Sequence, residues 1–149
     1  MIEARDGFAF VIDTKDYAGN FERETCAAVT GQVGECEVGR DTAAIATVEI
    51  ATLPKGKALL AWFDKHVSHV PDDHGCSRPC SIYQSPGGKG DYNSVAIWID
   101  ARPPAWIVEV MKARATAFLA MPAKWRKAVA VTGFRLIEIV PTTAREEAL

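Results

Sequence analysis

The order of apolar and polar residues divides the chain into short β-prone runs and longer stretches with helical spacing. Short runs rich in branched and aromatic residues, bounded by turn-forming residues, predict strands. Four runs fit this description: residues 8–12, 43–50, 94–99 and 134–140. A weaker run at residues 80–84 predicts a fifth strand, joined to residues 94–99 in a hairpin whose tip spans residues 85–93.

Apolar residues spaced three and four apart predict helices. The three stretches with this spacing are residues 20–30, 57–70 and 104–118. Asn20 is a suitable N-cap for the first helix, and a Pro-Pro pair suits the opening of the third. In the second helix, Trp62, His66 and His69 form a stripe beside the apolar face. A short helical turn is expected at residues 124–127.

The resulting order, β-α-β-α-(β-)β-α-β, favours an α+β fold in a single domain over residues 1–149. We expect a mostly antiparallel sheet with helices packed on one face. A ferredoxin-like arrangement with an inserted hairpin loop fits this order. Residues 142–149 are expected to form a frayed tail.

The sequence also bears on where the protein works. No apolar run reaches the roughly 18 residues needed to cross a bilayer, so no membrane association is expected. The first residues lack the basic and apolar regions of a signal peptide, which indicates a cytoplasm. In that compartment the four cysteines would be thiols or metal ligands rather than disulfides.

Charge is unevenly distributed along the chain. Residues 1–75 hold 13 acidic and 7 basic side chains, and residues 76–149 hold 6 and 10. Such asymmetry can mark an interaction surface, although the two halves of one domain also interleave. Basic residues gather in sequence around Trp125: Lys112, Arg114, Lys124, Arg126, Lys127 and Arg135. They suggest nucleic-acid binding through phosphates and a stacked base, against the alternative of an ordinary solvated helix face.

The stretch from residue 66 to 93 concentrates candidate metal ligands. His66, His69, Cys76 and Cys80 lie within fifteen positions, and Cys and His are the usual ligands of zinc. No cofactor is expected, and zinc is the one alternative to that expectation. The spacing matches no familiar zinc motif, so the alternative is that the histidines flank a helix and the cysteines pack as small apolar residues.

Other chemistry can be read from the same region and from the first strand. His74, Cys76 and Cys80 could centre a small cysteine-dependent enzyme, with the imidazole activating a thiol. Residues 87–90 superficially match a phosphate loop, but a strand rather than a helix follows, which favours a hairpin tip. Asp13 and Asp16, with Glu22 and Glu24 beyond them, could hold Mg²⁺, but turn-forming and helix-capping roles are the simpler explanation of these residues.

Residues 16–24, 73–82 and 94–98 resemble segments of small accessory proteins from tailed bacteriophages. The resemblance covers most of the chain and brings no catalytic residue with it. It implies a phage protein in the host bacterial cytoplasm. Such a protein would bind and inhibit or modulate a host or anti-phage defence component, for example CRISPR machinery or an immune signal.

We therefore expect a protein that binds a partner rather than an enzyme, with its contacts made by the 66–93 region and nearby aromatics. Interfaces are enriched in Tyr, Trp and Arg. The candidate partner-binding residues are Tyr83, Lys89, Tyr92, Trp98 and Trp106. Burial in the core is the alternative for each aromatic side chain.

Overall fold

The computed structural model describes residues 7–36, 38–71, 74–84, 92–140 and 143–149. Its main sheet has five antiparallel strands in the order β4-β5-β1-β6-β7. Their bounds are Gly7–Thr14 (β1), Cys80–Ile82 (β4), Ser94–Ile99 (β5), Val131–Val140 (β6) and Thr143–Ala148 (β7). A second, two-stranded sheet pairs β2 (Val70–Pro71) with β3 (Ser77–Arg78).

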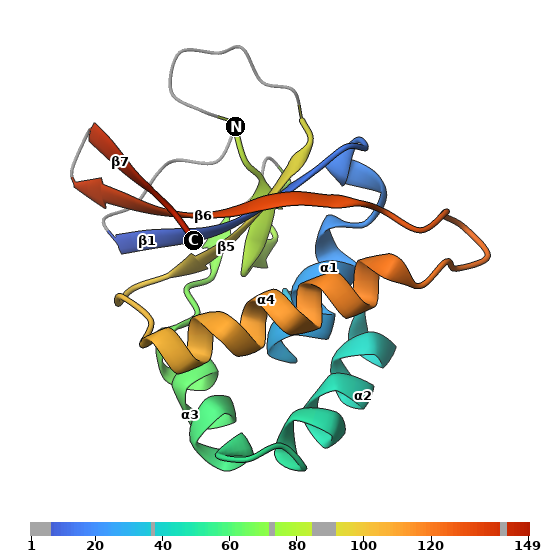
Figure 1. Ribbon diagram of the computed structural model, residues 1–149, viewed down its shortest axis with the longest axis horizontal. Coiled ribbons are helices and arrows are strands. Elements are labelled where there is room, and N and C mark those ends of the chain that lie inside the picture. The colour runs from blue at the N-terminus through green and yellow to red at the C-terminus, as the bar shows by residue number, and fades with distance from the viewer. Residues whose placement is uncertain (1–6, 37, 72–73, 85–91, 141–142) are drawn as a thin grey trace.

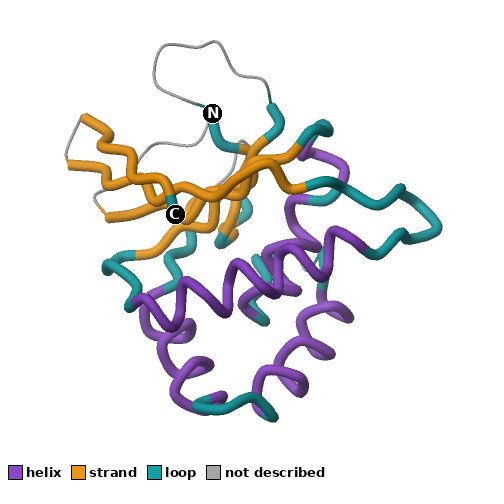
Figure 2. The backbone as a smooth tube through the Cα atoms, viewed as in Figure 1, coloured by secondary structure: helices purple, strands orange, loops and turns teal. Residues whose placement is uncertain are grey.

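The four α-helices lie together on one face of the five-stranded sheet (Figures 1 and 2). They span Glu22–Thr30 (α1), Arg40–Ala51 (α2), Gly56–His66 (α3) and Ala105–Ala120 (α4). A short 3₁₀ turn, Ala18–Asn20, precedes α1. The helices of the described residues include none that is both long and apolar enough to cross a bilayer.

The predicted fold class and sheet arrangement are confirmed. The chain passes from β1 through helices to β4, returns in β5, and crosses by α4 to β6. With the strand order β4-β5-β1-β6, this is ferredoxin-like connectivity. Helices α2 and α3 lengthen the first crossover, and β7 adds an edge strand. The hairpin between β4 and β5 is also present, although residues 85–91 of its connection lie outside the described residues.

Two apolar clusters hold the sheet between them. Strand β1 alternates strictly: Phe10 and Ile12 enter the cluster beneath the helices, whereas Ala9 and Val11 enter the cluster on the opposite face. The second cluster is closed by Val70 of β2, together with side chains from β5 and β6. Part of the 66–93 region is therefore folded against the sheet rather than held away from the body of the protein.

The predicted strand at residues 43–50 is wrong, because these residues form most of α2. Ala43, Ala46 and Ile50 are buried at helical spacing, while Ile45 and Val48 between them are exposed. Three alanines favour the helix, and a short apolar run cannot distinguish a strand from a helix by its pattern alone. The apolar run that suggested a strand belongs to a helix with apolar residues on both its inner and outer faces.

Three other predictions, one of a helix end and two of local structure, also differ from the structure. The helix predicted to reach residue 70 ends at His66, since Val67 is extended and bridges to Ile99 of the sheet. The predicted helical turn at residues 124–127 is instead a tight turn with a bridge between Ala123 and Arg126. The predicted frayed tail is strand β7, which pairs with β6 along its whole length.

Removal of residues 143–149 tests whether β7 contributes to stability. We expect the free energy of unfolding to fall by roughly 1 to 4 kcal/mol, since cross-strand pairs each contribute a few tenths to about 1 kcal/mol. Urea denaturation followed by tryptophan fluorescence measures the change. As a control, Glu146→Gln with Glu147→Gln removes the ion pairs to Arg135 and Arg102 but keeps the strand, and should have a smaller effect. An unchanged midpoint after the deletion would mean that the tail adds nothing.

Candidate functional site

The aromatic residues predicted to contact a partner are mostly not available for contact. Tyr83 and Trp98 are only 7% and 8% exposed, because both pack in the cluster on the second face of the sheet. Trp98 donates a hydrogen bond from Nε1 to Ser81 Oγ at 3.0 Å. Burial raises the pKa of the Tyr83 phenol above its usual value. The expectation that these two side chains are surface anchors is therefore wrong.

The remaining predicted contact residues have different positions. Trp106 is half-buried beneath Lys55, whose Nζ lies 5.2 Å from the ring centroid. Tyr92 is exposed and makes an edge contact with the exposed Tyr17. Lys89 lies outside the described residues. Among the described candidates, Tyr92 alone has an exposed aromatic side chain, at 49%.

The cysteines do not take the roles predicted for them. Cys36 and Cys76 form a disulfide, which overturns the expectation that all four cysteines are thiols or metal ligands. A disulfide sulfur is not a thiolate, so Cys76 in this state cannot serve as the nucleophile of a cysteine enzyme. Cys26 and Cys80 are free and buried.

The predicted zinc ligands are not assembled into a site. The side chain of His66 is engaged elsewhere, with Nδ1 lying 2.7 Å from Asp100 Oδ1. His69 has left the helical face that His66 occupies, because α3 ends between them. Among the described residues, no group of three or more His, Cys, Asp and Glu side chains is placed to hold a metal ion.

The arginines of the basic cluster are paired within the protein. Arg135 donates hydrogen bonds to both carboxylate oxygens of Asp13 at 2.8 Å, and these bonds raise the pKa of its guanidinium. Arg126 donates to the Phe118 carbonyl at the end of α4 at 3.0 Å. Arg114 donates from Nε to the Ala28 carbonyl at 2.9 Å. These three side chains thus join elements of the fold rather than forming one free basic face, and Asp13 is not a free magnesium ligand.

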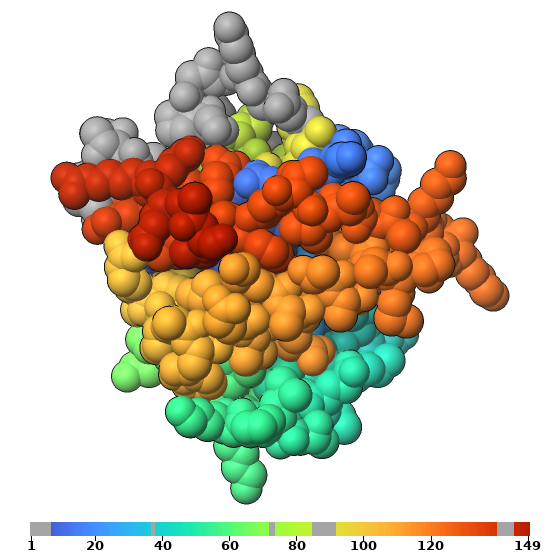
Figure 3. Space-filling view, in the orientation of Figure 1, coloured from blue at the N-terminus to red at the C-terminus, as the bar shows by residue number. Residues whose placement is uncertain are grey.

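The helical layer contains a large apolar groove that the sequence did not predict. Helix α1 packs against both α2 and α4, which leaves the facing sides of α2 and α4 separated above it. Two cavities, each of about 600 Å³, lie along this gap and share Thr42, Phe118 and Met121. They therefore form one continuous depression, which we call the α2–α4 groove. In Figure 3, α4 and α2 appear on the same face of the molecule.

The middle of the groove is lined mainly by apolar and small side chains. They come from α1, α2, α4 and the turn after α2: Ala28, Ile45, Ala46, Leu53, Val110, Ala113, Ala117, Phe118 and Met121. Ile45 is 62% exposed and Met121 is 67% exposed, although both are large apolar side chains. A contiguous exposed apolar surface of this kind usually marks a binding site.

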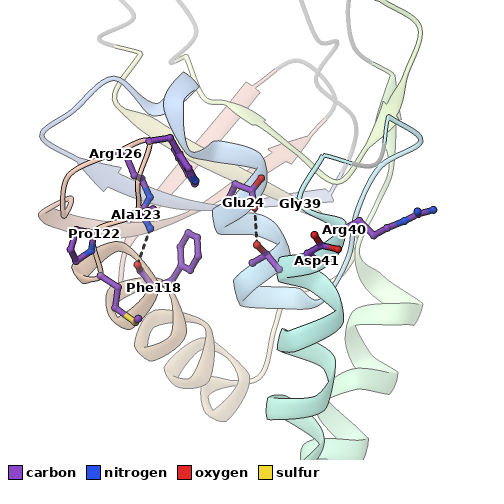
Figure 4. Close-up of a pocket in the computed structure, with 11 residues that line it drawn as sticks. Glu24, Gly39, Arg40, Asp41, Phe118, Pro122, Ala123 and Arg126 are labelled. Carbon is purple, nitrogen blue, oxygen red and sulfur yellow. Dashed lines mark hydrogen bonds between the residues drawn. The ribbon is translucent and has the colours of Figure 1, made fainter.

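One end of the groove is more polar. There Glu24 lies on one side of the cavity, and Phe118 and Arg126 lie on the other, while the side chain of Arg40 points away from it (Figure 4). The Thr42 hydroxyl donates to Glu24 Oε2 at 2.8 Å. Trp125, 54% exposed, borders this end. The groove therefore combines an apolar centre with an end at which an aromatic ring and a carboxylate are accessible.

Polar groups near the middle of the groove are already paired. Arg114 reaches between α4 and the other two helices, bonding to the Ala28 carbonyl of α1 and lying 3.6 Å from Glu49 of α2. It thereby fixes the spacing of the three helices that shape the groove. Apart from this arginine and Glu49, the side chains that line the middle of the groove are mainly apolar or small.

Part of this groove has a counterpart in the amino-acid composition of its helices. Helix α4 has three charged residues among sixteen, a lower share than the 24% of the whole chain, whereas α2, with three among twelve, does not differ from the chain as a whole. A helix that is apolar on most sides is normally buried on most sides. The composition of α4 is therefore a sequence signal for an extensive apolar surface, but that of α2 is not.

Replacement of Arg114 tests its role in holding the groove open. Arg114→Leu removes the hydrogen bond to the Ala28 carbonyl, and we expect a loss of about 1–3 kcal/mol in the free energy of unfolding. Thr116→Ala is the control on the same helix, because that hydroxyl is exposed and bonds only to the Lys112 carbonyl of its own helix. Chemical denaturation compares the two variants. Equal midpoints for both would contradict the role assigned to Arg114.

Comparison with known proteins found no match for this chain. No protein-family model, curated protein or solved structure matches the chain. The function therefore has to be inferred from the residues of the chain and from the geometry of the groove.

Proposed function

We propose that the protein is a non-enzymatic binding protein that holds an amphipathic helix of a partner protein in the α2–α4 groove. The observation that carries this proposal is the continuous apolar depression between two helices, with Ile45 and Met121 exposed at its edges. Burying such surface on a partner yields roughly 25 cal/mol for each Å² of apolar area removed from water.

The shape of the groove suits a helix. Its walls are two helices, and α2 has 12 residues, which corresponds to roughly 18 Å or about three turns at 1.5 Å per residue. Small side chains along the groove, Ala28, Ala46, Ala113 and Ala117, leave room for the larger side chains of an incoming helix. A helix that presents apolar residues at positions i, i+3 or i+4, and i+7 would fill it in the helix-in-groove manner.

The electrostatics of the site favour protein over nucleic acid. A phosphate backbone would need several uncommitted cations, whereas Arg114, Arg126 and Arg135 all bond to acceptors within the chain. The ionisable residues that line the groove balance in charge, with three acids and three arginines. Recognition by apolar contact with a polar rim is the pattern of protein interfaces.

The resemblance to phage accessory proteins narrows the proposed partner to a host or defence protein. Occupying a helix of that protein would inhibit or modulate it by blocking the surface that the helix otherwise contacts. No chemical step is required of this chain, which agrees with an oxidised Cys76.

A matched pair of substitutions on α2 tests the groove. Ile45 lines the groove, whereas Val48, one turn further along α2, is equally apolar and exposed but does not line it. We expect Ile45→Asp to weaken partner binding at least tenfold, equivalent to about 1.4 kcal/mol, and Val48→Asp to leave it within about twofold. Quantitative pull-down from a bacterial lysate gives the comparison, and thermal unfolding confirms that both variants fold.

Photocrosslinking identifies what occupies the groove. Benzoylphenylalanine placed at the exposed position of Ala117 should crosslink to a helical segment of the captured protein, and the labelled peptide should show apolar residues three and four apart. Crosslinks only to a second copy of this chain would replace the proposed partner with a homodimer. Labelling of a non-helical segment, or capture that Ile45→Asp leaves intact, would contradict the proposal.

A further inference from the structure

The four cysteines of the chain converge on one place in the fold. Cys26, Cys36, Cys76 and Cys80 all line a single small cavity of about 10 Å³, a space the size of about one water molecule. They come from α1, the loop after it, the approach to β3, and β4. The disulfide between Cys36 and Cys76 and the two buried thiols are therefore near neighbours, although 40 residues separate the bonded pair in sequence.

The two thiols are themselves a pair. Cys80 Sγ lies 3.8 Å from the Glu22 carbonyl oxygen in the first turn of α1. Cys26 follows Glu22 by four residues and so lies one turn along the same helical face. The pKa of the Cys80 thiol is raised well above its usual value. The larger cause is a hydrogen bond with Cys26, and the second cause is burial. The neutral form of the Cys80 thiol is therefore favoured, so an exchange through its thiolate requires alkaline conditions.

We propose that this dithiol is a second disulfide site, which exchanges with the Cys36–Cys76 bond. In the exchange the S–S bond of Cys36–Cys76 breaks and an S–S bond forms between Cys26 and Cys80. Two protons and two electrons pass from the buried pair to the outer pair, so that the number of disulfides is unchanged. The oxidant is the Cys36–Cys76 disulfide itself, and the reaction proceeds through a mixed disulfide.

The backbone around the outer disulfide supports a reversible exchange. Gly75, beside Cys76, has a φ of +82°, and no atom outside its immediate chain neighbours lies within 4 Å of the position that a Cβ would occupy, so the backbone here is not tightly packed. The segment that carries Cys36 is held beside β3 independently of the disulfide, because the backbone nitrogen of Glu35 donates a hydrogen bond to the Ser77 carbonyl at 2.8 Å. Gly34 packs directly against the Ser77 and Arg78 backbone, where an added Cβ would lie 2.5 Å from the Ser77 oxygen. Cys36 and Cys76 therefore remain close when their bond opens.

The exchange would change the attachment of the groove's central helix. With the outer disulfide closed, the loop after α1 is tied to the start of β3. With the inner disulfide closed, α1 itself would be tied to β4 through Cys26 and Cys80. Helix α1 supplies Ala28 to the groove from the side opposite to Cys26. The outer disulfide therefore constrains the loop after α1, whereas the inner disulfide would constrain α1 itself.

Differential alkylation of the full-length oxidised protein tests the exchange. The protein is incubated anaerobically at mildly alkaline pH with a small, substoichiometric amount of reduced glutathione, which starts exchange without supplying an oxidant. After an acid quench and denaturation, free thiols are labelled with N-ethylmaleimide; the disulfides are then reduced and labelled with iodoacetamide. Tandem mass spectrometry assigns each label to its cysteine, which is necessary because trypsin separates neither Cys26 from Cys36 nor Cys76 from Cys80.

We expect a measurable fraction of chains in which Cys26 and Cys80 carry the disulfide label and Cys36 and Cys76 carry the free-thiol label. The same incubation of Cys80→Ala, which lacks the inner pair, should leave no chain with a Cys26–Cys80 bond and keep Cys36–Cys76 as the main disulfide. The proposal is overturned if Cys26 and Cys80 of the wild-type protein carry only the free-thiol label at every time point. It is equally overturned if exchange pairs Cys26 or Cys80 only with glutathione.

Discussion

Burial of both faces of strand β1 is the constraint on which the rest of the structure depends. The strand pairs with β5 on one side and with β6 on the other, and its side chains alternate between two apolar clusters. A strand in this position requires a cover on each face of the sheet. The helices provide one cover. On the other face, Val70 and Tyr83 pack against side chains of β1, β5 and β6.

The groove follows from the way in which the first cover is built. A split β-α-β crossover needs a single helix, but here α2 and α3 are added between α1 and β4. Helix α1 occupies the central place against the sheet, so α2 is packed outside it and cannot also close against α4. The apolar residues that α2 and α4 present to each other are left facing a gap, which Arg114 bridges with polar contacts at one point. The same helix α1 carries Cys26 towards the cysteine cavity on its other side, so the groove and the cysteine cluster share one supporting element.

Much of the candidate site could not be read from the sequence, for reasons that particular residues make clear. Tyr83 and Trp98 look like interface anchors, but side-chain type does not reveal which face of a strand is covered by a distant segment. Cys36 lies 40 residues from Cys76, and spacing alone does not give disulfide connectivity. Ile45 was assigned to a strand, whereas it lies on α2 with its side chain exposed at the groove.

The sequence by itself determined the α+β class, the central strands β1, β5 and β6, the helices α1, α3 and α4, and the β4–β5 hairpin. Each of these depends on a local pattern of apolar residues, which can be recognised without knowing the contacts that the segment makes with the rest of the chain. Tertiary structure decided the helical state of residues 40–51, the pairing of the C-terminal residues as β7, the disulfide, and the groove. These depend on contacts between segments far apart in sequence, and the free energy of such contacts exceeds the small differences in local propensity that a sequence pattern records.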